Sequence, residues 1–467
     1  MGIANKRLVT MDDLSDQEIE AVFSLADEMK QAITEQRSVC QGKIMASLFF
    51  EPSTRTRLSF ESAMLRLGGS VITAADVNTT SLAKGESIAD MARIVGGYAD
   101  IIVIRHPWEG VAKVVADYSG RPVINAGDGG HEHPSQTLCD LYTLKMERKT
   151  IQGLKIALWG DLKYGRTVHS LTYALARFGA TIHFRPGPGL ELPDHVISKL
   201  VTEYGGQLQR CEAQNNGAKE RIFPLDAIYV TPSSPHQLTM MPDINIQIVL
   251  KERVDAIYMT RLQKERLAPT TEGQLLKKNY PSLDKKLLKA KEYEKTLVMH
   301  PLPRVDELAY EIDADPRSMY FKQAALGVPI RMALLALLSG AKKVDLPQGK
   351  GTSRLPGRDY PVYNRDFGVR CQNRNCVSVQ ETEKRYIKPE FKIVAKQPLK
   401  LRCAYCDHES FPQYIASSEQ NKKYHSASSF LLAEIKSEHL IIFDSEKEAR
   451  DRGFSPSRHA QVSVDNG

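Results

Sequence analysis

The sequence predicts an α/β protein with two doubly wound parallel-sheet domains and a small β domain after them. Short apolar runs alternate with helix-like stretches over residues 44–178, a pattern typical of parallel sheets covered on both faces. Four of the seven cysteines lie close together after residue 370, where this alternation has ended. A chain of 467 residues is also long enough for about three domains.

The composition is that of a globular protein, with 42% hydrophobic and 25% charged residues. The net charge of +7 at pH 7 comes without one dominant basic block, so no nucleic-acid partner is expected. No apolar run approaches the ~20 residues of a membrane span, and the N-terminus lacks the apolar core of a secretion signal. The odd, uneven set of cysteines argues against disulfides, so we expect a reducing, cytoplasmic location and no membrane partner.

The first domain is predicted over residues 1–150. A strand over 44–50 ends at Glu51-Pro52, because proline donates no ladder hydrogen bond and disfavours helix just before it. A helix then runs from about residue 55 to residue 67. Ser53 and Thr54 stand at its start, where free backbone N–H groups and the helix dipole attract an anion. With two arginines beside them, the expected anion is a phosphate-like dianion.

Further strands and helices follow in alternation. We expect strands at 70–74, 100–105 and 122–126, helices at 87–98 and 133–144, and a polar loop at 76–86. Ser53, Arg105 and His133 each come just after a predicted strand. Because ligands of open parallel sheets bind beyond the carboxyl ends of the strands, these three residues are expected to share one crevice.

The second domain is predicted over residues 151–317. Its expected strands are 155–159, 181–185, 256–259 and 296–299, and its first helix is 167–178. The segment 205–253 is rich in Asn, Gln, Pro and Ser and is predicted to be an irregular insertion. An apolar helix within 318–344 is expected to pack back on the first domain.

Six motifs in order resemble those of the aspartate and ornithine carbamoyltransferase family, over about residues 8–344. They are Ser53-Thr-Arg-Thr-Arg, Ser81-x-x-Lys84-Gly-Glu, Arg105-His-Pro, His133-Pro-Ser-Gln-Thr, Thr260-Arg-x-Gln-x-Glu-Arg and His300-Pro-Leu-Pro. Each motif alone fits a solvated loop or a capped helix, but six in sequence order make coincidence negligible. The aspartate enzyme is favoured, because His300-Pro301 stands where ornithine enzymes typically carry His-Cys.

The resemblance implies a reaction of carbamoyl phosphate with L-aspartate that gives N-carbamoyl-L-aspartate and phosphate, in pyrimidine biosynthesis. It implies that carbamoyl phosphate is bound by Ser53, Thr54, Arg55, Thr56, Ser81, Lys84, Arg105, His133, Gln136 and the backbone of Pro301 and Leu302. The catalytic set would be Arg55, Thr56, Lys84, Arg105 and His133. Aspartate would be bound by Lys84, Arg166, Arg261 and Gln263.

In the family the Ser81–Lys84 loop enters the site of a neighbouring subunit, so a homotrimer with shared sites is expected. Two other readings stay open at this point. One is an enzyme of the ornithine type. The other is a carbamoyltransferase scaffold without activity that binds a partner through its cysteine-rich domain.

The C-terminal part begins with a predicted linker over 345–359, rich in Gly, Pro and charge. The four clustered cysteines, Cys371, Cys376, Cys403 and Cys406, fit one closed, structural Zn²⁺ site, and no cofactor is needed for catalysis. Residues 360–412 resemble the zinc domain of the aspartate carbamoyltransferase regulatory chain, a zinc-ribbon-like β domain. Such domains would dock on the catalytic domains and join trimers into a dimer of trimers.

Two expectations concern what surrounds this domain. Between Val344 and Cys371 there is no room for the nucleotide-binding domain of the regulatory chain, so no CTP or ATP feedback through it is expected. The tail, 413–467, resembles a small zinc module of DNA-repair proteins. Ser429 and Ser457 stand where its cysteines would be, which predicts a degenerate, metal-free module.

Overall fold

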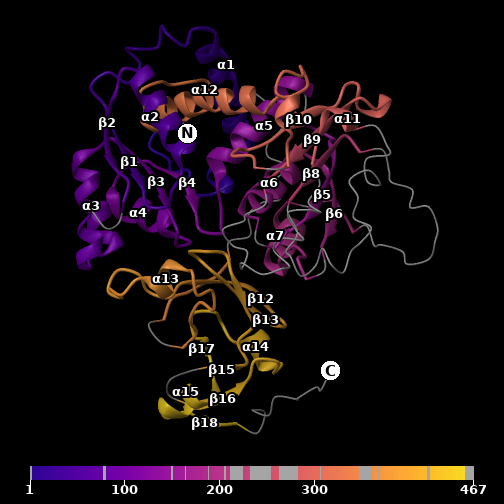
Figure 1. The fold of residues 1–467 in the computed structure, drawn as a ribbon. Coiled ribbons are helices and arrows are strands. Elements are labelled where there is room, and N and C mark those ends of the chain that lie inside the picture. Colours follow the sequence, from indigo (N-terminus) through magenta and orange to yellow (C-terminus); the bar gives the residue numbers. More distant parts are fainter. Residues whose placement is uncertain are drawn as a thin grey trace, which may run out of the picture.

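The computed structural model contains two parallel α/β sheets and a smaller β region (Figure 1). It describes residues 3–76, 80–148, 151–163, 165–187, 189–204, 207–210, 225–231, 254–261, 282–305, 307–346, 360–365, 368–417 and 421–457. The predicted linker over 345–359 lies almost wholly outside these residues, so the domain boundaries stay predictions.

The first sheet has four parallel strands in the order β2-β1-β3-β4. They are β1 (Ile44–Phe49), β2 (Ser70–Ala74), β3 (Ile101–His106) and β4 (Val123–Asp128). The helices are α1 (Asp16–Gln31), α2 (Thr54–Arg66), α3 (Ile88–Tyr98), α4 (Val111–Ser119) and α5 (Pro134–Arg148). Ser15 caps α1 in the predicted capping box with Glu18.

The second sheet has six parallel strands in the order β10-β9-β8-β5-β6-β7. They are β5 (Lys155–Gly160), β6 (Thr181–Pro186), β7 (Gln207–Arg210), β8 (Ala227–Val230), β9 (Ala256–Met259) and β10 (Leu297–Met299). Helices α6 (Arg166–Arg177) and α7 (Asp194–Tyr204) lie between its first strands, and the short α11 (Lys285–Leu288) precedes β10.

The prediction of an irregular insertion over 205–253 is wrong at two places. Strands β7 and β8 both lie within that segment, and β8 is a central strand between β5 and β9. The sequence hid β8 because only four residues, Ala227–Val230, form it, and they are buried between two neighbouring strands. A run this short carries too little periodicity to be recognised.

Helix α12 (Tyr320–Leu338) packs against α1, α2 and α5, as the prediction of a returning helix required. Buried side chains form a continuous core from α1 and α12 through α5 to the second sheet. The sequence-based expectation that no apolar run is long enough to span a membrane is wrong for this helix. Within the described residues, α12 passes that test by length and composition, but 72% of its apolar window is buried inside the protein. It is therefore the core helix that joins the two sheets.

The C-terminal region contains two four-stranded sheets. One is antiparallel and has the order β11-β12-β13-β14: Val362–Tyr363, Phe391–Lys396, Leu399–Cys403 and Glu409–Ser410. The other has the order β17-β15-β16-β18: Ile441–Phe443, Tyr414–Ala416, Lys423–Ser426 and Ser455–Pro456. Short helices α13 (Val377–Gln380), α14 (Leu431–Glu434) and α15 (Glu446–Asp451) complete the region.

The C-terminal region lies beneath the first sheet in Figure 1 and docks on it. Its apolar side chains continue the core formed by α3 and α4. The backbone of Glu109 pairs with the C-terminal region on both sides, donating to Asn375 O at 2.9 Å and accepting from Val377 N at 2.8 Å. The two parts of the chain therefore share both a core and an isolated β-bridge between Glu109 and Cys376.

Candidate active site and metal site

The start of α2 is built to receive an anion. Ser53 is its N-cap residue, and its side chain makes no capping hydrogen bond. The first-turn N–H groups of a helix have no partner within the helix, so those of α2 remain available to a ligand. Thr56, the third residue of the helix, is buried, whereas Thr54 and Arg55 are exposed.

Arg105 and His133 come together over Gly127 at the carboxyl end of β4. A Cβ at Gly127, whose φ is +116°, would lie 3.1 Å from Arg105 Nη1 and 3.3 Å from His133 Cδ2. Arg105 is held by Glu51 Oε1, 3.2 Å from Nη2, and by Ala126 O, 3.3 Å from Nη1. Because Gly127 has no side chain, the guanidinium of Arg105 and the imidazole of His133 can both lie close to its Cα.

A turn after β10 reaches the start of α2 from the second sheet. Arg55 Nη2 donates to the backbone oxygen of Leu302 at 2.7 Å. His300 shapes this turn: its Nδ1 accepts from Leu302 N at 2.8 Å, and its Nε2 lies 2.9 Å from Glu307 Oε1. Burial lowers the pKa of His300, against the opposing effect of Glu307. A neutral His300 therefore holds the Leu302 carbonyl in place.

Arg261, which follows a strand of the second sheet, acts on the charge of Arg55. Arg261 comes two residues after β9. Partial desolvation, with the nearby positive charge of Arg261, lowers the pKa of Arg55. Like charges repel, so a pair of guanidiniums close enough to affect each other is best stabilised by an anion between them.

Gln136 belongs to a buried network that the sequence did not reveal. Its Nε2 donates to Asp140 Oδ1 at 2.9 Å, and the same oxygen accepts from Tyr258 Oη at 3.0 Å and Gln323 Nε2 at 2.9 Å. Gln323 Oε1 in turn accepts from His300 N at 3.1 Å. These residues come from α5, β9, α12 and the turn after β10, so only the folded chain brings them together.

The remaining predicted residues are placed less completely. Ser81 and Lys84 lie in a short 3-10 helix, Ser81–Lys84, with exposed side chains that make no hydrogen bond or ion pair with another described residue. Arg166 is the first residue of α6, but its side chain lies outside what the structure describes, and so does all of Gln263.

The four clustered cysteines come together as one set. Cys371 Sγ lies 3.5 Å from Cys406 Sγ, and Cys376 Sγ lies 3.8 Å from Cys403 Sγ. A tetrahedral metal with metal–sulfur bonds of about 2.3 Å separates its sulfurs by roughly 3.8 Å, whereas a disulfide needs about 2 Å. Hydrogen bonds among the four thiols lower the pKa of Cys376 and raise the pKa of Cys403 and Cys406, so the sulfur spacing and not the pKa values indicates the metal.

Comparison with known proteins identifies the family. Residues 6–146 match the aspartate/ornithine carbamoyltransferase carbamoyl-P binding domain, and residues 236–338 match the Asp/Orn binding domain of the same family. The aspartate carbamoyltransferase catalytic subunit of Thermoplasma acidophilum is 43% identical over 340 residues, which cover 72% of this chain and 99% of that one. The chain belongs to the aspartate/ornithine carbamoyltransferase family.

Solved structures agree with this carbamoyltransferase assignment. The catalytic subunit of aspartate transcarbamoylase from Methanocaldococcus jannaschii superimposes with a TM-score of 0.56 at 41% identity, covering 71% of this chain and 97% of that one. Aspartate transcarbamoylase from Trypanosoma cruzi in complex with N-(phosphonacetyl)-L-aspartic acid gives a TM-score of 0.58 at 35% identity, covering 72% and 96%. The resemblance inferred from six motifs and the predicted fold class are both confirmed.

This carbamoyltransferase also carries a metal-binding domain. Residues 363–413 match the metal binding domain of the aspartate carbamoyltransferase regulatory chain. That range contains all four clustered cysteines, whose sulfur spacing fits a tetrahedral metal. A structural metal site therefore follows the two carbamoyltransferase domains in one chain.

Proposed function

We propose that the chain is an aspartate carbamoyltransferase of pyrimidine biosynthesis, which transfers the carbamoyl group of carbamoyl phosphate to the amine of L-aspartate. The observation that carries the proposal is the hydrogen bond from Arg55 Nη2, at the start of α2, to the Leu302 backbone oxygen after β10, at 2.7 Å, which joins the predicted sites of the two substrates. A substrate with a phosphate at one end and an acceptor with two carboxylates both need cations there. The reaction itself is inferred from the names of the relatives given above, which are aspartate carbamoyltransferases.

The phosphate is proposed to lie at the start of α2, held by Ser53, Thr54, Arg55 and Thr56. The uncapped first turn supports this placement. As the amine attacks, negative charge grows on the carbonyl oxygen, and Thr56, Arg105 and His133 are proposed to donate to it. The substrate supplies its own nucleophile, and the departing phosphate takes the amine proton, so the protein acts by positioning and electrostatics.

The acceptor side is proposed to use Arg166, Arg261 and Gln263 for the two carboxylates of aspartate. Gln136, fixed by Asp140, would hold the carbamoyl amide, and the carbonyls of Pro301 and Leu302 would orient the nitrogens. The Leu302 carbonyl already lies at Arg55 Nη2, which supports its place in the site. The side-chain ammonium of ornithine would be repelled by these arginines, whereas the side-chain carboxylate of aspartate would be attracted, so we favour aspartate.

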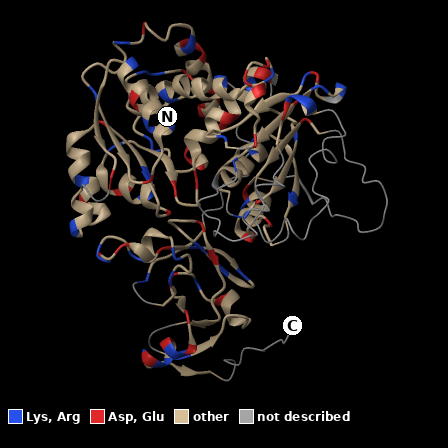
Figure 2. Ribbon diagram, in the orientation of Figure 1, with Lys and Arg blue, Asp and Glu red and all other residues tan. Residues whose placement is uncertain are grey.

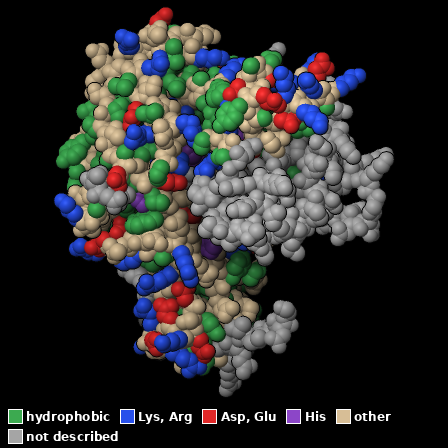
Figure 3. Space-filling view, in the orientation of Figure 1, with side chains coloured by type: hydrophobic (Ala, Val, Ile, Leu, Met, Phe, Trp, Pro, Cys, Tyr) green, Lys and Arg blue, Asp and Glu red, His purple; other side chains and the backbone are tan. Residues whose placement is uncertain are grey.

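Lys84 and Ser81 are proposed to complete the site of a neighbouring subunit in a homotrimer. Their side chains are exposed and make no hydrogen bond or ion pair with another described residue, which supports a role outside their own chain. Apolar side chains are also exposed on α2, β2 and α3: Leu58, Leu65, Ile72, Ile94 and Tyr98. Green side chains lie along this edge of the molecule in Figure 3. Such a surface fits a subunit interface.

For the metal site we propose Zn²⁺, because four thiolates in tetrahedral spacing suit it. A closed set of four ligands leaves no position for substrate, so this metal would be structural. The six cysteines that the structure describes are free, which supports a reducing, cytoplasmic setting. Acidic and basic residues are interspersed over the described chain in Figure 2, and the lack of a nucleic-acid partner stays a prediction.

The proposal is tested by measuring carbamoyl-aspartate formation by the purified protein, with ornithine as the alternative acceptor. Arg261→Gln is expected to raise KM for aspartate roughly 10- to 100-fold, the effect of one lost charge-assisted contact. Arg55→Gln and His133→Asn should instead lower kcat.

Arg385→Gln provides the control, because this arginine is exposed and pairs with Glu383 in the metal-binding domain. Its kinetics should match the unchanged protein. Failure of the unchanged protein to form carbamoyl-aspartate would favour the inactive-scaffold reading, and carbamoylation of ornithine would favour the other enzyme. Unchanged turnover in His133→Asn would remove His133 from the oxyanion site.

A further inference from the structure

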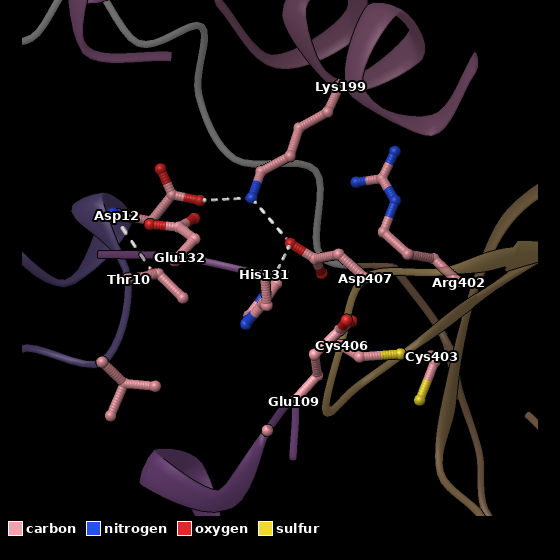
Figure 4. Close-up of polar contacts among 12 residues, drawn as sticks. Thr10, Asp12, Glu109, His131, Glu132, Lys199, Arg402, Cys403, Cys406 and Asp407 are labelled. Carbon is pink, nitrogen blue, oxygen red and sulfur yellow. Dashed lines mark hydrogen bonds and ion pairs between the residues drawn. The ribbon is translucent and has the colours of Figure 1, made fainter. Parts of the chain in front are cut away.

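A group of charged side chains lies where the metal-binding domain meets both α/β domains (Figure 4). Its members come from four separate segments of the chain: Asp12, His131, Glu132, Lys199, Arg402 and Asp407. Asp12 belongs to the 3-10 helix Met11–Asp13, Lys199 to α7, and Asp407 directly follows the metal ligand Cys406. The cluster is thus a junction of all three folded parts.

Asp407 is the residue that the metal-binding domain contributes at the centre. Its Oδ2 lies 2.9 Å from Lys199 Nζ and 3.8 Å from His131 Nε2. Its backbone adopts φ +58°, a left-handed conformation that aspartate and asparagine tolerate better than most residues. The metal-binding loop therefore presents this carboxylate to the other two domains from a constrained backbone.

His131 carries the contact into the loop that ends at His133. Its Nδ1 lies 3.1 Å from Asp128 Oδ2, while its Nε2 faces Asp407. Asp128 also accepts from the backbone N–H of Glu132 at 3.1 Å and of Gly110 at 2.8 Å. Hydrogen bonds to Asp128 therefore hold the segment 128–133 in its turn, and Asp407 of the metal-binding domain contacts that segment at His131.

A second contact reaches the same segment from the metal-binding domain. Glu109 Oε1 accepts from Gly130 N at 3.2 Å, and its Oε2 accepts from Asn373 Nδ2 at 2.6 Å. The segment is therefore contacted at two places: at His131 by Asp407, and at Gly130 by Glu109, which is itself bound to Asn373 of the metal-binding domain.

Lys199 already supplies the positive charge that the carboxylates need. Its Nζ lies between Asp407 Oδ2, at 2.9 Å, and Asp12 Oδ2, at 3.1 Å. His131, Glu132 and Asp407 lie close enough to one another to suggest a second metal site. With an ammonium bound to the same Asp407 oxygen, the cluster is better explained as an ionic junction than as a metal site.

We propose that the metal-binding domain positions the catalytic loop of its own chain, with Asp407 as a positioning residue that acts on His133 through His131. This inference rests on the proposed function, since the role of His133 belongs to it. The loop 128–133 is a tight turn closed by the bridge between Asp128 and Glu132, so a shift at His131 is transmitted to His133 two residues later. Misplacing a catalytic group by about 1 Å can cost up to 100-fold in rate.

The test is a double-mutant cycle on kcat with three variants: Asp407→Asn, His133→Asn and the two combined. Asparagine keeps the left-handed backbone and removes only the charge. Asp407→Asn is expected to lower kcat about 10-fold with the metal content unchanged, and to lower it no further once His133 is already replaced. His131→Asn, which leaves the metal-binding domain intact, should reproduce this result.

Tyr118→Phe is the matched control, because Tyr118 Oη donates to Tyr386 O at 2.7 Å across the same docked face, and Tyr118 makes no hydrogen bond to residues 128–133. It should leave kcat unchanged. An Asp407→Asn effect of equal size with and without His133, or no effect in either Asp407→Asn or His131→Asn, overturns the positioning role. Full activity of His133→Asn by itself instead contradicts the proposed catalytic function of His133.

Discussion

At the scale of single residues, Asp140 shows how the site is held together. One of its oxygens accepts hydrogen bonds from Gln136, Tyr258 and Gln323, and the residue is buried. Burial raises the pKa of Asp140 to about 6, against these hydrogen bonds, which lower it. The folded protein therefore binds this proton more tightly than the unfolded chain does.

This difference makes stability depend on pH in a definite direction. Because the folded-state pKa of Asp140 is raised to about 6, its contribution to the free energy of unfolding is present at low pH and is lost as pH rises through about 6. The expected loss is at most about 3 kcal/mol. Asp140→Asn should remove this pH-dependent part of the free energy of unfolding. Urea unfolding at several pH values between about pH 4 and 6.5 would measure the difference. The exposed Asp451→Asn is the control, and equal pH profiles for both variants would contradict the prediction.

At the scale of elements, the turn between β3 and α4 sets how the metal-binding domain docks. Gly110 is the N-cap residue of α4 with φ +87°, and a Cβ there would lie 2.7 Å from both Cβ and the backbone oxygen of Tyr405. The glycine is therefore needed for close approach as well as for backbone conformation. The adjoining Glu109 forms the isolated β-bridge through its backbone hydrogen bonds with Asn375 and Val377.

Gly110→Ala is therefore expected to loosen the docked domain. Real Cβ atoms do not approach other atoms so closely, so the domain must shift, at a cost of about 1–3 kcal/mol. Faster hydrogen exchange at the Glu109 and Val377 amides would report it. Gly120→Ala is the matched control: it has a similar φ of +64° at the other end of α4, but a Cβ there meets nothing within 4 Å. Equal exchange in the two variants would show that backbone strain alone is responsible.

At the scale of the whole molecule, the metal is proposed to determine both docking and assembly. Cys376 and Cys403 belong to the same buried core as Val111 and Val115 of α4. Loss of the metal would leave four thiols without their ligand and expose that face of α4. The sheet over residues 414–456 packs on this domain, where Tyr363 Oη accepts from Ile442 N at 3.0 Å, so we expect loss of the metal to disturb both sheets.

We propose that the metal-binding domains join two trimers, so removal of the metal by a zinc chelator is expected to reduce that dimer of trimers to trimers. Measurement of mass in solution before and after chelation, with zinc returned as the control, gives the result. Cys376→Ser should reproduce the effect without chelator, whereas Cys40→Ser, at a buried cysteine outside the cluster, should not. A mass that stays constant through chelation would contradict metal-dependent assembly.

The order of elements and the motifs could be predicted because each depends on neighbouring residues. The stop at Pro52, the start of α2 and the spacing of Cys371, Cys376, Cys403 and Cys406 are all local in sequence. Strand β8 could not be recognised, since its four residues are strand only through pairing with β5 and β9.

The sequence by itself determined the fold class, the family and the residues that can bind an anion or a metal, because helix starts, strand ends and cysteine spacing are short-range properties. Only the tertiary structure decided which of these residues meet. The contact of Arg55 with Leu302 spans 247 positions, and the contact of Lys199 with Asp407 spans 208. Such pairs are fixed by the packing of separate domains, and no local pattern in the chain encodes their distance.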